Sequence, residues 1–529
     1  MRLKKLKKRL EKSYGARPDV QYYEYDMNGI RTYFDYRYEN GLDEFLIDDT
    51  TWNDLSGDYV FKHINQGLST SGEQYLYYLL RSPAIDKAEY DRRAKLYELM
   101  ESNPDLRLKL QVILAKLGRR RAVRTCEVYQ PPSHDLGRML IYIIAVLLLI
   151  GSAISLIFSM AMLPVAIALF VILPIYHSNT VNRMYVDFAT LNYSISMLFA
   201  AKKVQKLSHT ELDEFMSPCY AALERTKSIS RIGSFPSKDI LGEFSELINS
   251  FLYLDLIFYE LLKNRLGKHH KDIFLVHEHL GRLDSAIAVA SYRKRLPAYV
   301  EPDIDFESST VHFYGEGLIH PHLANAVPND FDTGSSVLLT GSNASGKSTF
   351  LKTVALNAIF AQSICTVLGT RYAAPAFRIY TSMAISDDLL AGESYFISEI
   401  KSLKRITEAD ATEQPLLCVI DEVLRGTNTV ERIAASSELL KHLNTEKSLC
   451  LAATHDVELC TLLEGQYRLL HFEESVTEDG KVLFDYMIKE GPATTRNAIK
   501  LLGSMGFDKD LVNRAYEKAE QYSVEGKWR

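Results

Sequence analysis

A glycine-rich segment in the second half of the chain has residue types and spacing suited to phosphate binding. The run SSVLLTGSNASGKSTFLKTVAL contains the pattern G-x-x-x-x-G-K-S from Gly341 to Ser348, between a predicted strand and a predicted helix. Glycines let backbone N–H groups approach phosphate oxygens, Lys347 supplies a positive charge, and a serine hydroxyl can bind Mg²⁺. The pattern therefore predicts a nucleoside triphosphate site at this loop.

Two further apolar runs end in residues that could act on a bound nucleotide. The run LLCVID ends at Asp421, which could hold Mg²⁺ through water, and the next residue, Glu422, could orient or deprotonate water. The run LCLAAT is followed by His455, which could sense a terminal phosphate through a hydrogen bond. Ligands of open parallel sheets bind beyond the carboxyl ends of the strands, so we expect these residues near the glycine-rich loop.

A weaker signal occurs in the segment ISDDLLAGESYFISEI. Gly392 follows Ala391 in a predicted flexible turn, and Ser394 stands near the start of a predicted helix. A hydroxyl and free N–H groups at such a position can meet an anion. An ordinary helix cap is the alternative interpretation.

The composition is that of a folded multidomain protein. Of 529 residues, 47% are hydrophobic and 24% are charged, which excludes a mostly disordered chain and suggests about three domains. The net charge of −6 means that nucleic acid would need a local basic patch. Apolar residues have helical spacing up to about residue 300, whereas short apolar runs then alternate with helical stretches. That alternation is typical of a mostly parallel sheet.

One segment departs from this pattern, because residues 139–182 contain no Asp, Glu, Lys or Arg. A membrane-spanning helix needs about 20 apolar residues, so this length predicts two spans joined by a turn near residues 159–161. Lys and Arg residues near both ends place those ends in the cytoplasm. A buried helical hairpin inside a soluble core is the alternative.

The motifs TGSNASGKST, DDLLAGESYFISEI, DEVLRGTNT and ATHD, in this order and spacing, resemble the ATPase domain of the MutS mismatch-repair family. The resemblance extends over residues 45–137 and 181–525. It implies an ATP hydrolase of the P-loop class that uses ATP and Mg²⁺ and forms a homodimer through its ATPase domain.

The resemblance also implies a role for each matching residue. Catalytic roles fall on Glu422, His455 and Lys347, and the Mg²⁺ ligands are Ser348 and Asp421. The residues of the ATP-binding loop are Gly341, Ser342, Asn343, Ala344, Ser345, Gly346, Lys347, Ser348 and Thr349. The trans-subunit residues, which would reach the nucleotide of the partner, are Gly392, Glu393 and Ser394.

The chain departs from that family pattern in several places. Ala344 and Ser345 replace a Met-Gly pair in the loop, and Glu393 replaces a basic residue. The position of the family's adenine-stacking aromatic residue is taken by Ala326. Residues 1–44 contain no Phe-x-Glu motif that could wedge into a base step, and the uncharged hairpin stands where the family inserts its DNA clamp.

These observations predict an α+β multidomain fold, with an α-helical core and lever, an inserted transmembrane hairpin and an ABC-type P-loop α/β domain. The expected parts are a basic N-terminal tail (1–44), the first part of the helical core (45–137), the hairpin (138–180), the second part of the core with the lever (181–300), the ATPase domain (301–490) and a C-terminal helical dimerisation segment (491–529). We expect a protein of the inner (cytoplasmic) membrane that contacts lipid through residues 139–180, with its ATPase domain facing the cytoplasm.

The favoured function is a membrane-anchored ATPase that couples its nucleotide state to movement of the lever, with DNA left open as a partner. The first alternative is a genuine sensor of mismatched or structured DNA in repair. The second is an ABC-type ATPase that energises a separate membrane partner.

Overall fold

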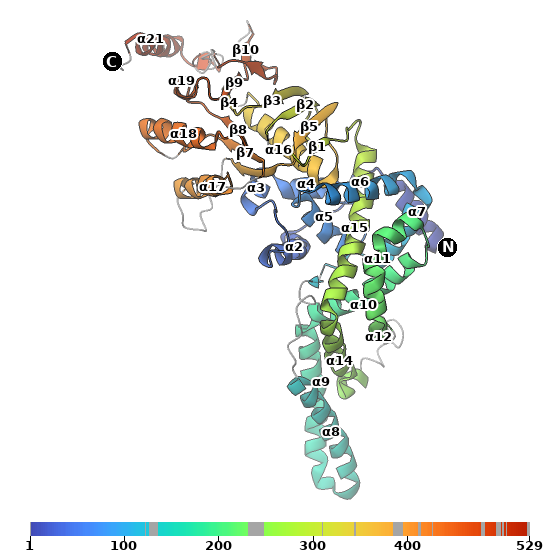
Figure 1. The fold of residues 1–529 in the computed structure, drawn as a ribbon. Coiled ribbons are helices and arrows are strands. Elements are labelled where there is room, and N and C mark those ends of the chain that lie inside the picture. The colour runs from blue at the N-terminus through green and yellow to red at the C-terminus, as the bar shows by residue number, and fades with distance from the viewer. Residues whose placement is uncertain are drawn as a thin grey trace. The chain divides into compact units, whose positions relative to one another are not determined.

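A computed structural model describes residues 2–121, 123–125, 136–230, 248–308, 310–342, 345–383, 395–410, 414–425, 427–477, 482–493, 499, 502, 503 and 505–525. The chain forms two compact units, each built from three stretches of sequence (Figure 1). The helical unit comprises residues 1–43, 62–78 and 96–295, and the sheet unit comprises residues 44–61, 79–95 and 296–529.

The helical unit is built from helices of very different length. They are α1 (Arg2–Ser13), α2 (Glu24–Glu39), α5 (Thr70–Leu80), α7 (Pro104–Leu117), α8 (Leu136–Phe158), α9 (Leu163–Arg183), α10 (Tyr185–Gln205), α11 (Thr210–Arg225), α12 (Lys227–Ser230), α14 (Leu254–Lys268) and α15 (His270–Arg295). Proline in the first turn of α7 and Gly118 with φ 76° after its last residue are the usual helix boundaries. Helix α1, in the region predicted as a basic tail, packs on α7 and buries Leu10.

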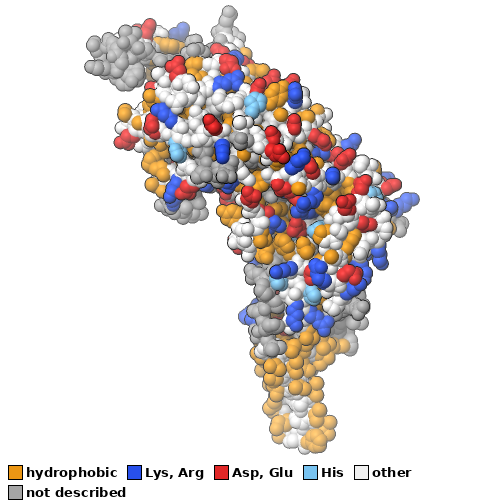
Figure 2. Space-filling view, viewed as in Figure 1, with side chains coloured by type: hydrophobic (Ala, Val, Ile, Leu, Met, Phe, Trp, Pro, Cys, Tyr) orange, Lys and Arg blue, Asp and Glu red, His pale blue; other side chains and the backbone are white. Residues whose placement is uncertain are grey.

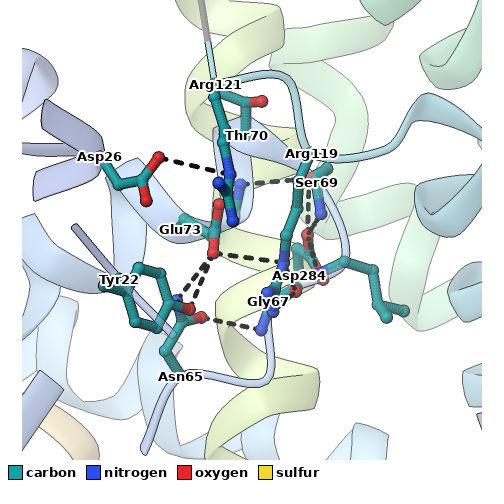
Figure 3. Close-up of polar contacts among 12 residues, drawn as sticks. Tyr22, Asp26, Asn65, Gly67, Ser69, Thr70, Glu73, Arg119, Arg121 and Asp284 are labelled. Atoms are coloured by element: carbon teal, nitrogen blue, oxygen red, sulfur yellow. Dashed lines mark hydrogen bonds and ion pairs between the residues drawn. The ribbon is translucent and has the colours of Figure 1, made fainter. Parts of the chain in front are cut away.

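Helices α5 and α15 approach each other closely. Asp284 of α15 accepts hydrogen bonds from the backbone N–H groups of Leu68 (2.9 Å) and Ser69 (2.7 Å), so it caps the start of α5 from a distant part of the chain (Figure 3). Burial raises the pKa of Asp284 to about 6. A Cβ at Gly281 would lie 2.6 Å from the Cβ of Tyr75, so only glycine permits this helix contact.

Glu73 of α5 is the centre of a second buried polar group. Its Oε1 accepts hydrogen bonds from the Tyr22 hydroxyl and the Asn65 side-chain amide, both at 3.0 Å, and lies 3.2 Å from Arg119 Nε (Figure 3). Burial raises the pKa of Glu73, and Arg119 opposes that shift. Arg119 also donates to the carbonyl oxygen of Gly67 at 2.8 Å. These contacts join three separate segments of the helical unit.

Helices α8 and α9, joined by a short 3₁₀ turn (Met160–Met162), form a helical hairpin at the position where the sequence predicts one. By length and composition, Gly137–Phe158 and Met160–Arg183 are each able to cross a membrane. Few of their side chains are buried in the structure, and Phe158 at the tip is 84% exposed. This exposure differs from that of a hairpin in the core of a soluble protein.

The sheet unit contains a six-stranded sheet of order β12-β9-β4-β8-β7-β6, in which all pairs except β12–β9 are parallel. Its strands are β4 (Val337–Thr340), β6 (Arg378–Ser382), β7 (Leu416–Asp421), β8 (Ser448–Ala453), β9 (Arg468–His471) and β12 (Lys489–Glu490). A four-stranded sheet of order β1-β5-β2-β3 and a β10–β11 pair accompany it. They comprise β1 (Asp303–Asp305), β2 (Phe313–Leu318), β3 (Asn329–Thr333), β5 (Arg371–Pro375), β10 (Glu474–Val476) and β11 (Val482–Phe484).

Helices cover the six-stranded sheet, which explains why its central strands are mostly apolar and almost entirely buried. All six residues of β8 are buried, as are all four of β4. Helices α17 and α18 contribute Leu403 and Leu440 to the same core cluster as Cys418 of β7, while α16 packs on β7 and β8. Strands buried on both faces read as continuous apolar runs. The helices of this unit are α3 (Asp49–Asp54), α4 (Gly57–Ile64), α6 (Lys87–Ser102), α16 (Lys347–Ile364), α17 (Tyr395–Asp410), α18 (Thr429–Leu443), α19 (Glu458–Leu462) and α21 (Lys509–Glu525).

Two stretches that the sequence assigned to the helical core lie in the sheet unit. Asp54 at the end of α3 accepts hydrogen bonds from the Thr381 hydroxyl (2.6 Å) and from the Met383 N–H (2.9 Å), next to β6. The backbone N–H of Ala84 donates to the carbonyl oxygen of Gln362 in α16 at 3.0 Å. These contacts complete the sheet unit with residues far upstream in the sequence.

Candidate functional site

The glycine-rich loop connects β4 to α16, as the sequence predicts. Gly341 has φ 142°, and a Cβ at this position would lie 2.7 Å from the carbonyl oxygen of Phe472, so glycine is required there. Gly346 caps the N-terminus of α16, and Lys347 is the first residue of the helix. The loop therefore presents backbone groups and a helix N-terminus on one side of the sheet, an arrangement suited to anions.

The side chain of Lys347 is buried and held by hydrogen bonds. Its side chain is 5% exposed, and its Nζ donates to the carbonyl oxygens of Gly341 and Ser342, both at 2.9 Å. Burial lowers the pKa of Lys347 to about 8, and Asp421 opposes this shift. A phosphate group in this position would stabilise the ammonium form, because it supplies the negative charge that the loop carbonyls lack.

Glu422 and His455 meet at the ends of β7 and β8. His455 Nε2 lies 3.0 Å from Glu422 Oε1 and 3.5 Å from Lys347 Nζ, so the three predicted catalytic side chains form one group. Burial lowers the pKa of His455, and the neighbouring Lys347 and Arg425 lower it further. The neutral imidazole can then donate one hydrogen bond to a carboxylate or to a phosphate.

The backbone after β7 is held in an uncommon conformation. Glu422 and Leu424 have φ values of 59° and 57°, in the left-handed region that non-glycine residues rarely adopt. Glu399 of α17 stabilises this turn, because its Oε1 accepts from the N–H groups of Leu424 (2.6 Å) and Arg425 (3.4 Å). Arg425 in turn forms an ion pair with Glu422. Such strain is often found at functional sites.

Asp421 and Ser348 fit the expected role of Mg²⁺ ligands. Asp421 Oδ1 is buried and has no hydrogen-bond partner among the described residues. Its charge acts on Lys347 and His455, so the carboxylate lies beside the catalytic group. Mg²⁺ prefers oxygen ligands, and both the unpartnered carboxylate oxygen of Asp421 and the hydroxyl of Ser348 in the cavity wall are of that kind.

A cavity of about 630 Å³ opens beside the loop. Lys347, Ser348, Thr349 and Glu422 contribute to its wall, which is the side where phosphates would lie. The remaining wall is formed largely by apolar and aromatic side chains, namely His320, Leu323, Ala326, Phe350, Phe472 and Tyr486. The volume and the division into a charged and an aromatic part suit a nucleotide.

Sequence reasoning missed two groups of residues at the candidate site. Tyr486 and Phe472 supply aromatic rings to the cavity, whereas the sequence had only Ala326 at the expected stacking position. Tyr486 follows β11 and is positioned by the side chain of Asn329, which donates to its carbonyl oxygen at 2.9 Å. Tyr486 lies outside every motif that the sequence shows, so no local signal could identify it. Glu399 lies within the segment ISDDLLAGESYFISEI, in which only Gly392, Glu393 and Ser394 were given a role.

The structure describes some of the remaining predicted residues but not others. Ser345 is buried, and its hydroxyl has no hydrogen-bond partner among the described residues, while Ser342 donates to Glu474 at 2.7 Å. The predicted loop residues Asn343 and Ala344 lie outside the residues that the structure describes, as do the trans-subunit residues Gly392, Glu393 and Ser394.

Comparison with known proteins places this site in context. Residues 337–523 match the family MutS domain V. The chain is 35% identical over 191 residues to the DNA mismatch repair protein MutS of Thermus thermophilus, an alignment that covers 36% of this chain and 23% of the relative. It is 34% identical over 257 residues to the MutS of Geobacillus thermodenitrificans, covering 46% and 27%, and 31% identical over 270 residues to that of Thermotoga petrophila, covering 50% and 34%.

The chain thus spans between about a quarter and a third of the length of these relatives. The matched region contains β4, the glycine-rich loop and the ends of β7 and β8, where the candidate catalytic group lies. Residues 337–523 are thus similar to MutS domain V, and the chain is similar to these MutS proteins over part of its length.

Proposed function

We propose that this chain is a P-loop ATPase of the MutS type that binds and hydrolyses ATP with Mg²⁺. The observation that carries the proposal is the meeting of Lys347, Glu422 and His455 at one end of the six-stranded sheet, beside a cavity with a glycine-rich loop. Ligands of doubly wound sheets bind at this edge.

The proposal gives each side chain a distinct task. Lys347 exchanges the loop carbonyls for phosphate oxygens, and Glu422 accepts a proton from the attacking water or orients it. His455 stands between them and reports the presence of the terminal phosphate by a hydrogen bond. Ser348 and Asp421 would hold Mg²⁺, which neutralises phosphate charge when it is bound.

Two substitutions separate binding from hydrolysis. Glu422→Gln should retain ATP affinity but lower kcat by roughly 10²-fold or more, because the proton acceptor is lost. Lys347→Ala should weaken ATP binding itself by roughly tenfold or more, because a charged hydrogen-bond donor is lost. Glu438→Gln, which changes a 74% exposed carboxylate on α18, is the control. Unchanged turnover in Glu422→Gln would contradict the assigned role of this residue.

We further infer that the ATPase acts as a dimer in which Ser394 reaches the nucleotide of the partner. Ser394→Ala and Lys347→Ala should each lose activity, but a mixture of the two should regain part of it through one intact composite site. Mixed dimers can be isolated with two affinity tags. If such dimers form and show no regained activity, the site is complete within one chain.

The hairpin supports anchoring in the cytoplasmic membrane, because its two helices are long, apolar and exposed. The helical unit would then transmit the nucleotide state, and α15, whose 26 residues span about 39 Å, is long enough to serve as its lever. Flotation of the full-length chain with phospholipid vesicles tests the anchoring. A chain that stays soluble without detergent and does not float would contradict it.

A second candidate function is recognition of mismatched or structured DNA, which is favoured by the names of the relatives, DNA mismatch repair protein MutS. Affinity for duplex, mismatched and branched DNA should be measured over a series of salt concentrations. Binding through phosphates predicts a steep loss of affinity with salt. A slope near zero would exclude nucleic acid as the partner.

A further inference from the structure

A third apolar segment lies beside the base of the hairpin. Helix α14 packs against α8, and the two helices run side by side in Figure 1. Just before α14, the ring of Phe251 stacks on Phe170 of α9 with centroids 4.5 Å apart, and Tyr253 stacks on Tyr142 of α8 at 5.8 Å. Residues 248–253 therefore follow the hairpin for part of its length.

Polar contacts hold this segment at a fixed position along the hairpin. The hydroxyl of Tyr253 donates to the carbonyl oxygen of Leu173 at 2.7 Å. Asp255, in the first turn of α14, lies 2.9 Å from His177 Nε2 and so has a partner on α9. The segment is thus held against both hairpin helices, and the side chains of Tyr253 and Asp255 have polar partners there.

The length of α8 indicates how deep the segment would lie in a bilayer that the hairpin spans. The distance from Arg138 to Phe158 along the helix is about 30 Å, which equals the thickness of a hydrocarbon core. Tyr142 lies four residues, or about 6 Å, inside that boundary. Tyr253, stacked on Tyr142, shares this depth, and Phe251, beside Phe170, lies deeper. If the hairpin spans the bilayer, residues 248–258 lie within its lipid.

The exposed face of α14 changes from apolar to basic along the helix. Leu254 and Leu261 are 52% and 50% exposed, and their spacing of seven residues places them on one side of the helix. Arg265 and Lys268 continue the same side and are also exposed. Figure 2 likewise shows the apolar surface of the hairpin giving way to Lys and Arg side chains. Apolar residues followed by basic ones are what a lipid surface with anionic headgroups requires.

We propose that residues 248–258 form a third membrane-contacting element, inserted into one leaflet beside the hairpin. Leu254 faces the acyl chains, Leu261 lies among the headgroups, Arg265 faces anionic phosphates, and Lys268 lies further out, in water. This inference rests on the proposed anchoring of the hairpin, whose apolar surface continues onto α14. It predicts a wider and asymmetric footprint in the leaflet on the cytoplasmic side.

Fluorescence quenching from within the bilayer tests the depth of each position. Single cysteines at exposed sites of the full-length chain, with Cys126 replaced by serine, are labelled with the dye NBD and reconstituted into vesicles of phosphatidylcholine and phosphatidylglycerol. Some vesicles contain lipid with a doxyl quencher on the acyl chain. The sites are Leu254→Cys, Leu147→Cys as the hairpin reference (60% exposed) and Lys268→Cys as the water-facing control on the same helix.

We expect the labels at Leu147 and Leu254 to lose most of their emission in doxyl vesicles and the label at Lys268 to keep it. Quenching at Leu147 alone, with Leu254 behaving like Lys268, would overturn the third element and leave the anchored hairpin intact. Absence of quenching at all three sites would overturn both the third element and the anchoring on which it rests.

Discussion

At the scale of single residues, the charged side chains of the candidate site could be predicted from the sequence, whereas its aromatic side chains could not. Lys347, Glu422 and His455 could be predicted because each follows an apolar strand at the same edge of a parallel sheet. The aromatic wall could not be predicted, because Tyr486 lies far along the chain and reaches the cavity only through folding. A phosphate-binding loop has a characteristic local sequence. A contact with the base needs only one aromatic side chain, which can come from any part of the chain.

Tyr486 is expected to contact the base of ATP. Tyr486→Ala should weaken ATP binding by about 1 kcal/mol or more, which is roughly fivefold, because stacking of a base on an aromatic ring is lost. Tyr486→Phe keeps the ring and should bind ATP normally. Isothermal titration with ATP measures the effect. Inorganic triphosphate, which has no base, should bind both variants equally well, and a loss there would point to a disturbed loop instead.

At the scale of elements, α5 and α15 approach each other closely at Gly281. Gly281→Ala would place a methyl group 2.8 Å from the carbonyl oxygen of Ser71, so the helices must separate. We expect a loss of about 1–3 kcal/mol in the free energy of unfolding, measured by urea denaturation followed by circular dichroism. Gly151→Ala in α8 is the control, because no described atom lies within 4 Å of the added Cβ.

The same contact predicts a dependence of stability on pH. The pKa of Asp284 is raised to about 6 in the folded chain, so the folded state binds a proton that the unfolded state releases. The resulting stabilisation is present below the unfolded pKa and is lost as the pH rises through about 6, with a total of about 3 kcal/mol. Amide exchange of α5 should therefore slow as the pH falls from 7 to 4, after correction for the chemical rate.

Asp284→Asn supplies the comparison for that measurement. The asparagine oxygen can still accept hydrogen bonds from Leu68 and Ser69 but does not titrate. The difference between the two chains in amide-exchange protection of α5 should shrink or change sign as the pH falls from 7 to 4. A constant difference would show that another group is responsible.

The elements themselves were largely predictable from periodicity. The alternation of apolar runs and helical stretches after residue 300 predicted the mostly parallel sheet, and the absence of charge in residues 139–182 predicted the hairpin. The four-stranded sheet was not foreseen, because strands such as β2, with the sequence FYGEGL, have glycines and no continuous apolar run. Their burial depends on neighbours that the local sequence does not show.

At the scale of the whole molecule, anchoring and catalysis should be separable. The residues 144–172 can be replaced by a short Gly/Ser linker, which keeps Tyr142, Leu173 and His177 for their contacts with Tyr253 and Asp255. We expect this variant to lose resistance to alkaline extraction from membranes, because the spanning helices are gone. ATPase activity should remain, since no cavity residue lies in the hairpin. Parallel loss of activity would mean that the hairpin supports the fold of the catalytic unit.

The boundaries of the units could not be read from the sequence, and their arrangement has a consequence for synthesis. Asp54 and Ala84 leave the ribosome long before Thr381 and Gln362, to which they bond in the sheet unit. The hairpin is also made before the strands of that unit. The first residues of the sheet unit must therefore wait, unpaired, while the helical unit and its apolar hairpin emerge. If the hairpin anchors the chain and the sheet unit hydrolyses ATP, as proposed, then the growing chain meets the membrane before its ATPase site is complete.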